Sequence, residues 1–426
     1  MGRKKKRSRR RRRRKEKNNC TSKAESSFPN IIVPEEIIVE ILSRLPLDSL
    51  TRFTSVSKQW CSLISDISVA KTGSLAGLVL SDSGAYSFSP HSIDQHQQEV
   101  LHIHMKSFRV PDNMHGYVMG SCNGLLLMHT DEDLFLWNPL TRFFKKVLAF
   151  DRLRDVSYRV RSGLCYDSTS DEYKPVIAFA HQTPSYGGEF VVVGSLKSKS
   201  WAVIHFPYRV PTVESGPIVN ENLHWYDCKI NDSGNYFLSP HQIIYFDARM
   251  DEFKEVPMPD PGGEDGDIIC GLGTLDGCLF MFRSGNSEKN VELLVMKDYG
   301  VQESWTIMVV VSDCLTSSSY NESLEPLGYT KNGEILTRVW TWMECGWQIW
   351  AFNPNDNSHR RISIPEVPNC YALTMHKESL IIPTDYDWEE EEQKGEASYV
   401  FHCNYSRRLK KGKDGYWTTE YIEDSA

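Results

Sequence analysis

A unit of about 50 residues recurs along this 426-residue chain, and it constrains the fold more than any other feature. Each unit opens with a small or Asn/Asp turn followed by apolar residues, as in Asn123-Gly124 before Leu125–Met128. Residues that accept positive φ, placed between apolar segments, predict β-hairpins. A second strand pair follows in each unit, and equivalent positions in these pairs are 59, 50, 51 and 55 residues apart. These positions are Trp137, Leu196, Phe246, Lys297 and Phe352.

This period predicts an all-β propeller after a short helical region. It is close to the ~50 residues of a four-stranded blade, and a closed ring of blades protects the strand edges. The units are predicted at 117–150, 160–207, 216–257, 268–311 and 326–364. A sixth unit would pair early strands (75–105) with late ones (371–383 and 398–405) and close the ring. Six blades are favoured and seven stay open. No helix of ordinary length is expected after residue 75.

Three short helices are predicted before the repeats, between Ile31 and about Ile67. Pro34 suits the start of the first helix, and the two acidic residues after it favour the positive end of the helix dipole. Its apolar face comprises Ile37, Ile38, Ile41, Leu42 and Leu45. Pro46 ends this helix, and Leu50, Phe53 and Val56 indicate a second. Ser57 is a plausible N-cap for the third. Such a small module buries little alone, so it packs either on a partner or on a neighbouring domain.

The helical stretch resembles an F-box. The resemblance is carried by Val33–Pro46 (VPEEIIVEILSRLP) and Leu50–Trp60 (LTRFTSVSKQW), with Val33 where the family usually has Leu. It implies docking onto the Skp-family adaptor (ASK type in plants) of a cullin-based ubiquitin ligase. The positions that match the hydrophobic interface are Pro34, Ile37, Ile41, Leu42, Leu45, Pro46 and Leu50.

The β-rich region resembles the plant F-box-associated interaction domain, which is kelch-like. Matching pieces include Gly120–Leu125, Leu136–Pro139, Gly163–Asp167 and Met296–Val301. The resemblance spans roughly residues 31–405. It implies a non-catalytic adaptor without a cofactor, whose propeller binds a target protein for ubiquitination. The expected domains are a basic tail (1–28), an F-box module (29–70) and a propeller (71–420) with an acidic insertion near 385–396.

Charge is strongly segregated along the chain. Residues 1–17 hold 13 Lys or Arg and one Glu, a charge of +12, whereas the remaining 409 residues carry -20. The tail cannot bury a core, so we expect disorder there. It is predicted to be a nuclear address, with the cytoplasm as the other open location. The basic residues are Arg3, Lys4, Lys5, Lys6, Arg7, Arg9, Arg10, Arg11, Arg12, Arg13, Arg14 and Lys15. The alternatives are a nuclear protein that binds RNA through this tail, or a solvated tail with no specific partner. Nucleic-acid binding is expected only through this tail, because the rest of the chain is acidic overall.

Other features argue against secretion, membrane insertion and catalysis. The chain has no apolar run of about 18 residues and no secretory signal. Its 11 cysteines lack CxxC spacing, which is typical of a soluble intracellular protein. The segment Gly120–Gly124 has the outline of a nucleophile elbow, but an apolar strand follows it, so a hairpin turn is favoured. His102 and His104 lack a third metal ligand. The acidic run Asp385–Glu392 lacks the order of a calcium loop.

Overall fold

The structure is a computed structural model of the 426-residue chain. It describes residues 33–70, 407–411, 417–421 and most of 73–383. The undescribed segments within 73–383 are 82–83, 91–105, 109–116, 130–132, 150–157, 182–189, 205, 207, 209–215, 229–240, 262–267, 285–289, 313–322, 342–345 and 363–369. The chain divides into two units, residues 1–45 and 46–426, which are described separately.

Within residues 33–70 the structure has the three predicted helices: α2 (Glu35–Ser43) in the first unit, and α3 (Leu47–Phe53) and α4 (Lys58–Ala70) in the second. Pro34 was expected at the first helical position, but it is the N-cap of α2, so the helix begins one residue later than predicted. The Ser57 cap is confirmed, because the backbone N–H of Trp60 donates to Ser57 Oγ at 3.1 Å. Val56 was expected in the second helix but lies after α3. It is exposed there rather than part of an apolar helix face.

Six four-stranded antiparallel sheets follow the helices. The first two complete sheets contain β4 (Tyr117–Cys122), β5 (Leu125–His129), β6 (Asp133–Asn138), β7 (Phe143–Ala149), β8 (Tyr158–Asp167), β9 (Glu172–His181), β10 (Phe190–Ser195) and β11 (Ser200–Ile204). The third contains β12 (Ile218–Val219), β13 (Asn222–Cys228), β14 (His241–Asp247) and β15 (Glu252–Glu255). The fourth contains β16 (Ile268–Leu275), β17 (Cys278–Ser284), β18 (Asn290–Met296) and β19 (Trp305–Ser312), with the 3-10 turn η2 (Gln302–Ser304). The fifth contains β20 (Ser323–Tyr329), β21 (Ile335–Thr341), β22 (Gly346–Phe352) and β23 (His359–Ile362). Each of these sheets corresponds to one predicted unit.

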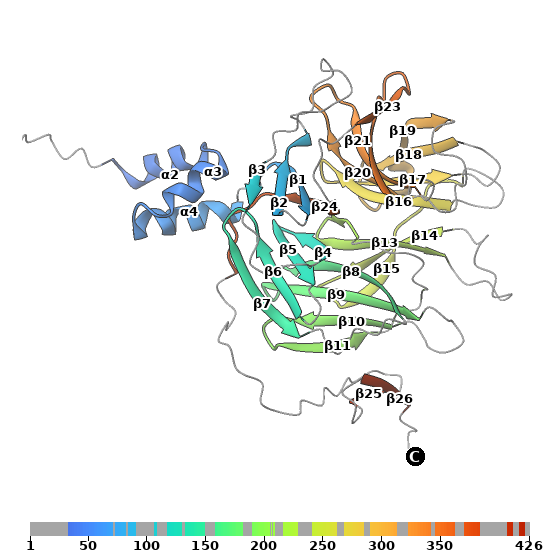
Figure 1. Ribbon diagram of the computed structural model, residues 1–426, viewed down its shortest axis with the longest axis horizontal. Helices are drawn as coiled ribbons and strands as arrows, with labels where there is room; N and C mark the ends of the chain where they lie inside the picture. The colour runs from blue at the N-terminus through green and yellow to red at the C-terminus, as the bar shows by residue number, and fades with distance from the viewer. Residues whose placement is uncertain are drawn as a thin grey trace, which may run out of the picture. The chain divides into compact units, whose positions relative to one another are not determined.

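The sixth sheet joins the two ends of the repeat region, as predicted. Its strands are β24 (Cys370–Lys377), β1 (Leu75–Ser81), β2 (Gly84–Phe88) and β3 (Lys106–Phe108), in the order β24-β1-β2-β3. In Figure 1 the dark red β24 lies beside the blue β1, and the register pairs Leu75 with Lys377. Of the two predicted late strands, residues 371–383 supply β24, whereas 398–405 lie outside the described residues.

The hydrophobic core shows that the ring has six blades. Six buried clusters are formed, and each combines residues of two neighbouring sheets. One cluster joins Leu78 of the closing sheet to Trp137 of β6, and another joins Leu373 of β24 to Ile349 of β22. Every blade is therefore packed on both faces by its neighbours, which is how a closed ring protects its sheets.

The hairpin turns have the backbone geometry that the sequence predicted. Asn123 and Gly124 have φ values of 50° and 81°, and Asp276 and Gly277 also have φ values of 50° and 81°. Two successive residues at positive φ are typical of the tight turns that match the twist of a hairpin. The β4–β5 and β16–β17 turns are therefore two copies of the same turn in different blades.

Candidate functional site

An exposed apolar surface lies on α2 and on the residues just before it. Val33, Ile37 and Ile41 have 42%, 49% and 53% of their surface exposed, and we call these three residues the α2 surface. Ile37 and Ile41 are one helical turn apart and therefore share a face. An aliphatic side chain gains about 1.5–3 kcal/mol on full burial. Two half-exposed isoleucines on one face therefore favour contact with another protein surface.

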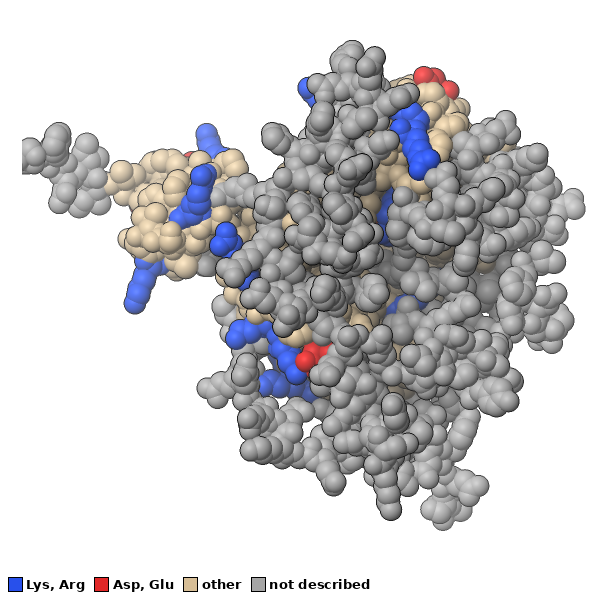
Figure 2. Space-filling view, in the orientation of Figure 1, with Lys and Arg blue, Asp and Glu red and all other residues tan. Residues whose placement is uncertain are grey.

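The structure divides the seven residues predicted to contact a partner into two groups. Pro34, Ile37, Ile41 and Pro46 are exposed and Leu45 is partly exposed, whereas Leu42 and Leu50 have no exposed surface. Leu42 and Leu50 thus act as core residues, and the others are available for direct contact. The helical stretch appears in Figure 2 as mostly uncharged surface with separate cationic side chains. Val33 was not among the predicted contacts, although its place directly before the predicted contact Pro34 is a sequence signal that could have identified it.

In the five blades from β4 to β23, the hairpins that join first to second strands and third to fourth strands lie at one end of the propeller. Strands within a blade are antiparallel, so these two kinds of hairpin share an end. We call this end the turn face. An Asx residue recurs there at the end of the third strand of several blades. The side-chain Oδ1 of Asn138, Asp247 and Asn353 each accepts the backbone N–H two residues later. This turn is a local device that the sequence repeats.

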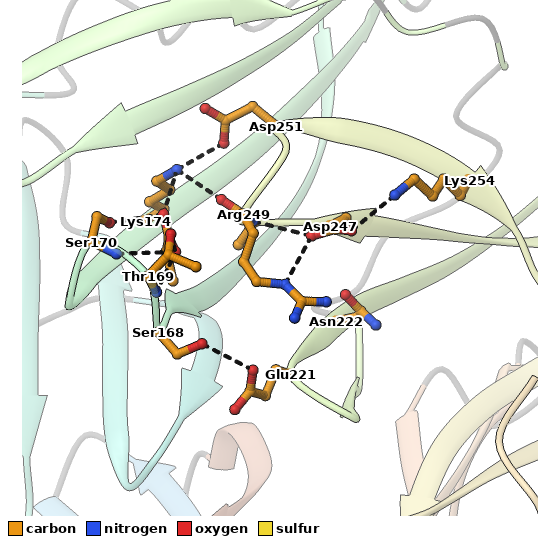
Figure 3. A network of polar contacts seen from close by, with 12 residues as sticks. Ser168, Thr169, Ser170, Lys174, Glu221, Asn222, Asp247, Arg249, Asp251 and Lys254 are labelled. Carbon is orange, nitrogen blue, oxygen red and sulfur yellow. Dashed lines mark hydrogen bonds and ion pairs between the residues drawn. The ribbon is translucent and has the colours of Figure 1, made fainter.

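A polar network on the turn face joins the β8–β11 blade to the β12–β15 blade (Figure 3). Lys174 Nζ lies 3.2 Å from Asp167 Oδ2 in its own blade. The same amine donates to the Ala248 carbonyl at 2.8 Å and to Asp251 Oδ1 at 2.9 Å in the next blade. Ser168 Oγ donates to Glu221 Oε2 at 3.3 Å and adds a second link between the blades. We call Lys174, Asp167, Ala248 and Asp251 the interblade clamp.

Electrostatics keep the interblade clamp ionised. Burial alone would raise the pKa of Asp167, but hydrogen bonds from Thr169, Ser170 and Lys174 hold this pKa well below its ordinary value. Burial alone would lower the pKa of Lys174, but Asp251 and Asp167 raise it above its ordinary value. The charges of Asp167 and Lys174 are therefore both compensated by their partners, and the clamp is a structural link between two blades.

The chain segment after β24 crosses the turn face and binds the first complete blade. We call residues 378–383 the latch. The buried Asn138 donates from Nδ2 to the carbonyl oxygens of Ser379 at 3.1 Å and Ile381 at 2.9 Å. The side chain of Ile381 also packs against the core cluster of the β4–β7 and β8–β11 blades. On the other side, the Gly73 N–H donates to the Glu378 carbonyl at 2.9 Å. The latch thus links the start of the ring to its first complete blade.

Neither the interblade clamp nor the latch was predicted as a site. The latch partners are separated by 241 residues, and Lys174 is 77 residues from Asp251. The repeated Asx turn is the one sequence signal that points to Asn138, since its NH2 group is left free to donate when Oδ1 caps the turn.

The structure tests the candidate nucleophile elbow among the described residues. The hairpin interpretation of Gly120–Gly124 holds, because β4 ends at Cys122 and β5 begins at Leu125. Burial raises the pKa of the Cys122 thiol to about 12, so a thiolate nucleophile is absent near neutrality. In the part of the chain that the structure describes, no group of three or more His, Cys, Asp or Glu could hold a metal. Within the same part, no helix has the length and apolar character of a membrane span.

Several predicted features lie outside the described residues. They are the basic residues from Arg3 to Lys15, the histidines between His91 and His115, and the acidic run Asp385–Glu392.

Comparisons with known proteins cover both parts of the chain. Residues 32–72 match the family model of the F-box domain, and residues 77–386 match that of the F-box associated beta propeller domain. An F-box/kelch-repeat protein of Arabidopsis thaliana is 30% identical over 300 residues, which cover 66% of this chain and 79% of the relative. The F-box protein CPR1 of Arabidopsis thaliana is 28% identical over 403 residues, covering 86% of this chain and 94% of the relative.

Proposed function

Because the chain belongs to the plant F-box proteins with an F-box associated beta propeller domain, we propose that it is a substrate-recognition adaptor of a Skp-cullin-F-box ubiquitin ligase. In this proposal the F-box docks a Skp-family adaptor of the ASK type, and the adaptor connects the chain to a cullin. The propeller binds a target protein. The chain then acts by holding the target near the ligase at high effective concentration, and it carries out no bond chemistry itself.

The α2 surface is the observation that carries this proposal. It lies inside the segment that matches the F-box, and two of its members, Ile37 and Ile41, are among the residues expected at the adaptor interface. Central aliphatic residues of an interface contribute through burial of the surface that they expose in the free protein. We assign the direct contacts to Pro34, Ile37, Ile41, Leu45 and Pro46. Leu42 and Leu50 shape the helices that present them.

Binding of the full chain to a purified ASK-type adaptor, measured by calorimetry, tests the docking step. We expect Ile37→Glu to weaken binding roughly 30-fold or more, the range of an interface hot spot. Ile382→Glu is the matched control, because Ile382 is also 49% exposed but lies on the propeller. Equal effects of the two substitutions, or no adaptor binding by the intact chain, would contradict the proposal. Circular dichroism of both variants checks that the fold is retained.

The docking variant also tests target recognition. A chain with Ile37→Glu keeps its propeller but is expected to lose the adaptor, so a bound target should escape ubiquitination and accumulate on it. We therefore expect quantitative mass spectrometry to find the target enriched on the Ile37→Glu chain relative to the intact chain. A set of bound proteins that is the same for both chains would count against the adaptor role.

We further propose that the basic tail directs the protein to the nucleus. A charge of +12 within residues 1–17 is typical of an import signal. Replacing the tail Lys and Arg residues by Gln in the fluorescently tagged full chain should move the protein to the cytoplasm in live-cell images. An unchanged distribution would refute this part of the proposal.

A further inference from the structure

Exposed apolar side chains of the propeller are concentrated on the turn face. Among the described residues of the propeller, the large apolar side chains that are exposed are Met250, Val301, Ile307 and Ile382. Met250 lies in the β14–β15 turn, Val301 in the β18–β19 turn and Ile382 in the latch. Met250 and Val301 are 60% and 44% exposed, and their blades share a core cluster. Exposed apolar side chains on neighbouring turns favour contact with another protein surface.

The turns of these two blades are fixed to each other by Tyr299, which belongs to the β18–β19 turn. Its hydroxyl oxygen accepts a hydrogen bond from Asn222 Nδ2 at 3.3 Å and lies 2.8 Å from His224 Nε2. Burial raises the pKa of Tyr299 to about 12, so the hydroxyl stays neutral at ordinary pH. Trp305 Nε1 donates to the Pro257 carbonyl at 2.9 Å and forms a second link between the blades. The surface is therefore held in place before a partner arrives, which lowers the entropy cost of binding.

Negative charge on the turn face is concentrated in the same two blades. We call their hairpin-turn residues the Tyr299 sector, which comprises residues 220–221, 248–251, 276–277 and 297–304. The sector contains five acidic and two basic residues, all of them exposed, and its net charge is -3. This charge becomes -2 when Lys174, which bonds Asp251, is counted. The corresponding turns of the β4–β7, β8–β11 and β20–β23 blades carry +1. Figure 3 shows Glu221, Arg249 and Asp251 of the sector beside the interblade clamp.

We propose that the Tyr299 sector binds a basic segment of the target protein that also carries apolar side chains. This inference rests on the proposed function and names the chemistry of the target. Cationic groups of the segment complement the net negative charge of the sector. Its apolar side chains cover Met250 and Val301, which supply the buried centre of the interface.

Other occupants fit the sector less well. The basic tail has the right charge, but Met1 is the only large apolar residue within residues 1–17. A second basic segment of the chain, β25 (Arg407–Lys411), already pairs with β26 (Trp417–Tyr421). A second copy of the chain is opposed by like charge, because residues 18–426 carry -20. The phosphates of a nucleic acid would be repelled for the same reason.

Fluorescence anisotropy with labelled 12-residue peptides tests the proposal on the full chain. The peptides alternate Lys with Leu, Lys with Ser, or Glu with Leu. We expect the Lys-Leu peptide to bind about tenfold more tightly than the Lys-Ser peptide, because only the first covers apolar surface. Met250→Ser with Val301→Ser should weaken binding of the Lys-Leu peptide by about the same factor. Ile382→Ser is the matched control, since it removes an exposed apolar side chain from the latch on the same face, and it should leave binding nearly unchanged.

A charge reversal supplies a second readout. Glu303→Lys should weaken binding of the Lys-Leu peptide about threefold at low salt, and the loss should shrink as salt is added. Asp356→Lys is the matched control, because it makes the same change in net charge on the exposed β22–β23 turn outside the sector. We expect a smaller loss there. Circular dichroism checks that each variant keeps its fold.

Four outcomes would overturn the proposal. Equal losses from the double substitution and Ile382→Ser would remove the sector as the binding surface. Equal affinities for the Lys-Leu and Lys-Ser peptides would mean that charge alone acts. Binding of the Glu-Leu peptide that the double substitution also weakens tenfold would reverse the sign of the partner. A rise in Lys-Leu affinity on deleting residues 1–17 or 407–421 would identify a segment of this chain as the occupant.

Adaptor binding measured on the same variants separates this proposal from the adaptor role. Every variant should bind the ASK-type adaptor as tightly as the intact chain does, because no substitution lies in the F-box. Adaptor binding without peptide binding would overturn the Tyr299 sector alone. Peptide binding that depends on Met250 and Val301, without adaptor binding, would support the sector as a binding surface and overturn the adaptor role.

Discussion

The latch makes two glycines in identical turns differ in how well they tolerate substitution by Ala. Gly124 and Gly277 both have φ of 81° and both follow an Asx residue at φ of 50°. An Ala at either position pays the conformational cost of a left-handed residue, about 1–2 kcal/mol. A Cβ on Gly277 would meet no atom within 4 Å. A Cβ on Gly124 would lie 2.3 Å from Ser379 Oγ and 2.7 Å from the Lys377 carbonyl oxygen, so the latch would have to move.

The extra cost of Gly124→Ala follows from what the latch would lose. Displacement breaks the two hydrogen bonds from Asn138 to the latch, each contributing about 1 kcal/mol. We expect Gly277→Ala to lower the free energy of unfolding by about 1.5 kcal/mol and Gly124→Ala by about 3.5 kcal/mol. With ~2.1 cal/mol/K per residue over the propeller domain matched at residues 77–386, these values correspond to Tm decreases of about 2 °C and 5 °C.

Calorimetric melts of the full-length variants measure these shifts, and a double-mutant cycle tests their cause. Gly124→Ala and Asn138→Ala act on the same latch, so their combined effect should be about 2 kcal/mol smaller than the sum. Gly277→Ala and Asn138→Ala act on different blades and should add. Equal Tm decreases for the two glycine variants, or additive effects of Gly124→Ala and Asn138→Ala, would falsify the reasoning.

Two further predictions concern buried groups. Lys174→Met should lower the unfolding free energy by about 3 kcal/mol at pH 7, because it leaves the buried Asp167 carboxylate without its cationic partner. Asp167 has a folded-state pKa well below that of the unfolded chain, near 3.9. The stabilising contribution of Asp167 is therefore complete above about pH 4 and is lost as the pH falls through its folded-state pKa. The destabilisation caused by Lys174→Met should therefore shrink in acid. Urea melts at several pH values measure this change. Iodoacetamide at pH 8 should modify the exposed Cys61 and spare the buried Cys122, whose pKa is raised to about 12. Peptide mass spectrometry would identify the modified cysteine. Rapid labelling of Cys122 in the folded chain would contradict its burial.

The blade architecture could be predicted because its signals are local. The hairpin at Asn123-Gly124 depends on two adjacent residues that accept positive φ, and the end of β6 at Asn138 depends on an Asx turn. Repetition of such signals at a period of about 50 residues then predicts the ring. The blade number was settled by the six interblade core clusters.

The contacts between blades could not be predicted in the same way. Nothing near Lys174 in the sequence indicates that Asp251 will be its partner, since only the packing of two blades brings them together. The exposure of individual residues on the apolar face of α2 could not be predicted either. Periodicity places Ile41 and Leu42 on one broad face, but it does not tell which of them the fold buries, and the structure exposes the first and buries the second.

The position of β24 also has a consequence for biosynthesis. Until this strand leaves the ribosome, β1 lacks its neighbour and the facing sides of the β1–β3 and β20–β23 sheets lack Leu373, which packs between them. The nascent chain therefore carries an unpaired edge on β1 while the 288 residues between β1 and β24 (82–369) are being translated. A chaperone that shields this edge would have to leave before residues 370–377 can take its place, so the growing polypeptide depends on its final blade strand to end that exposure.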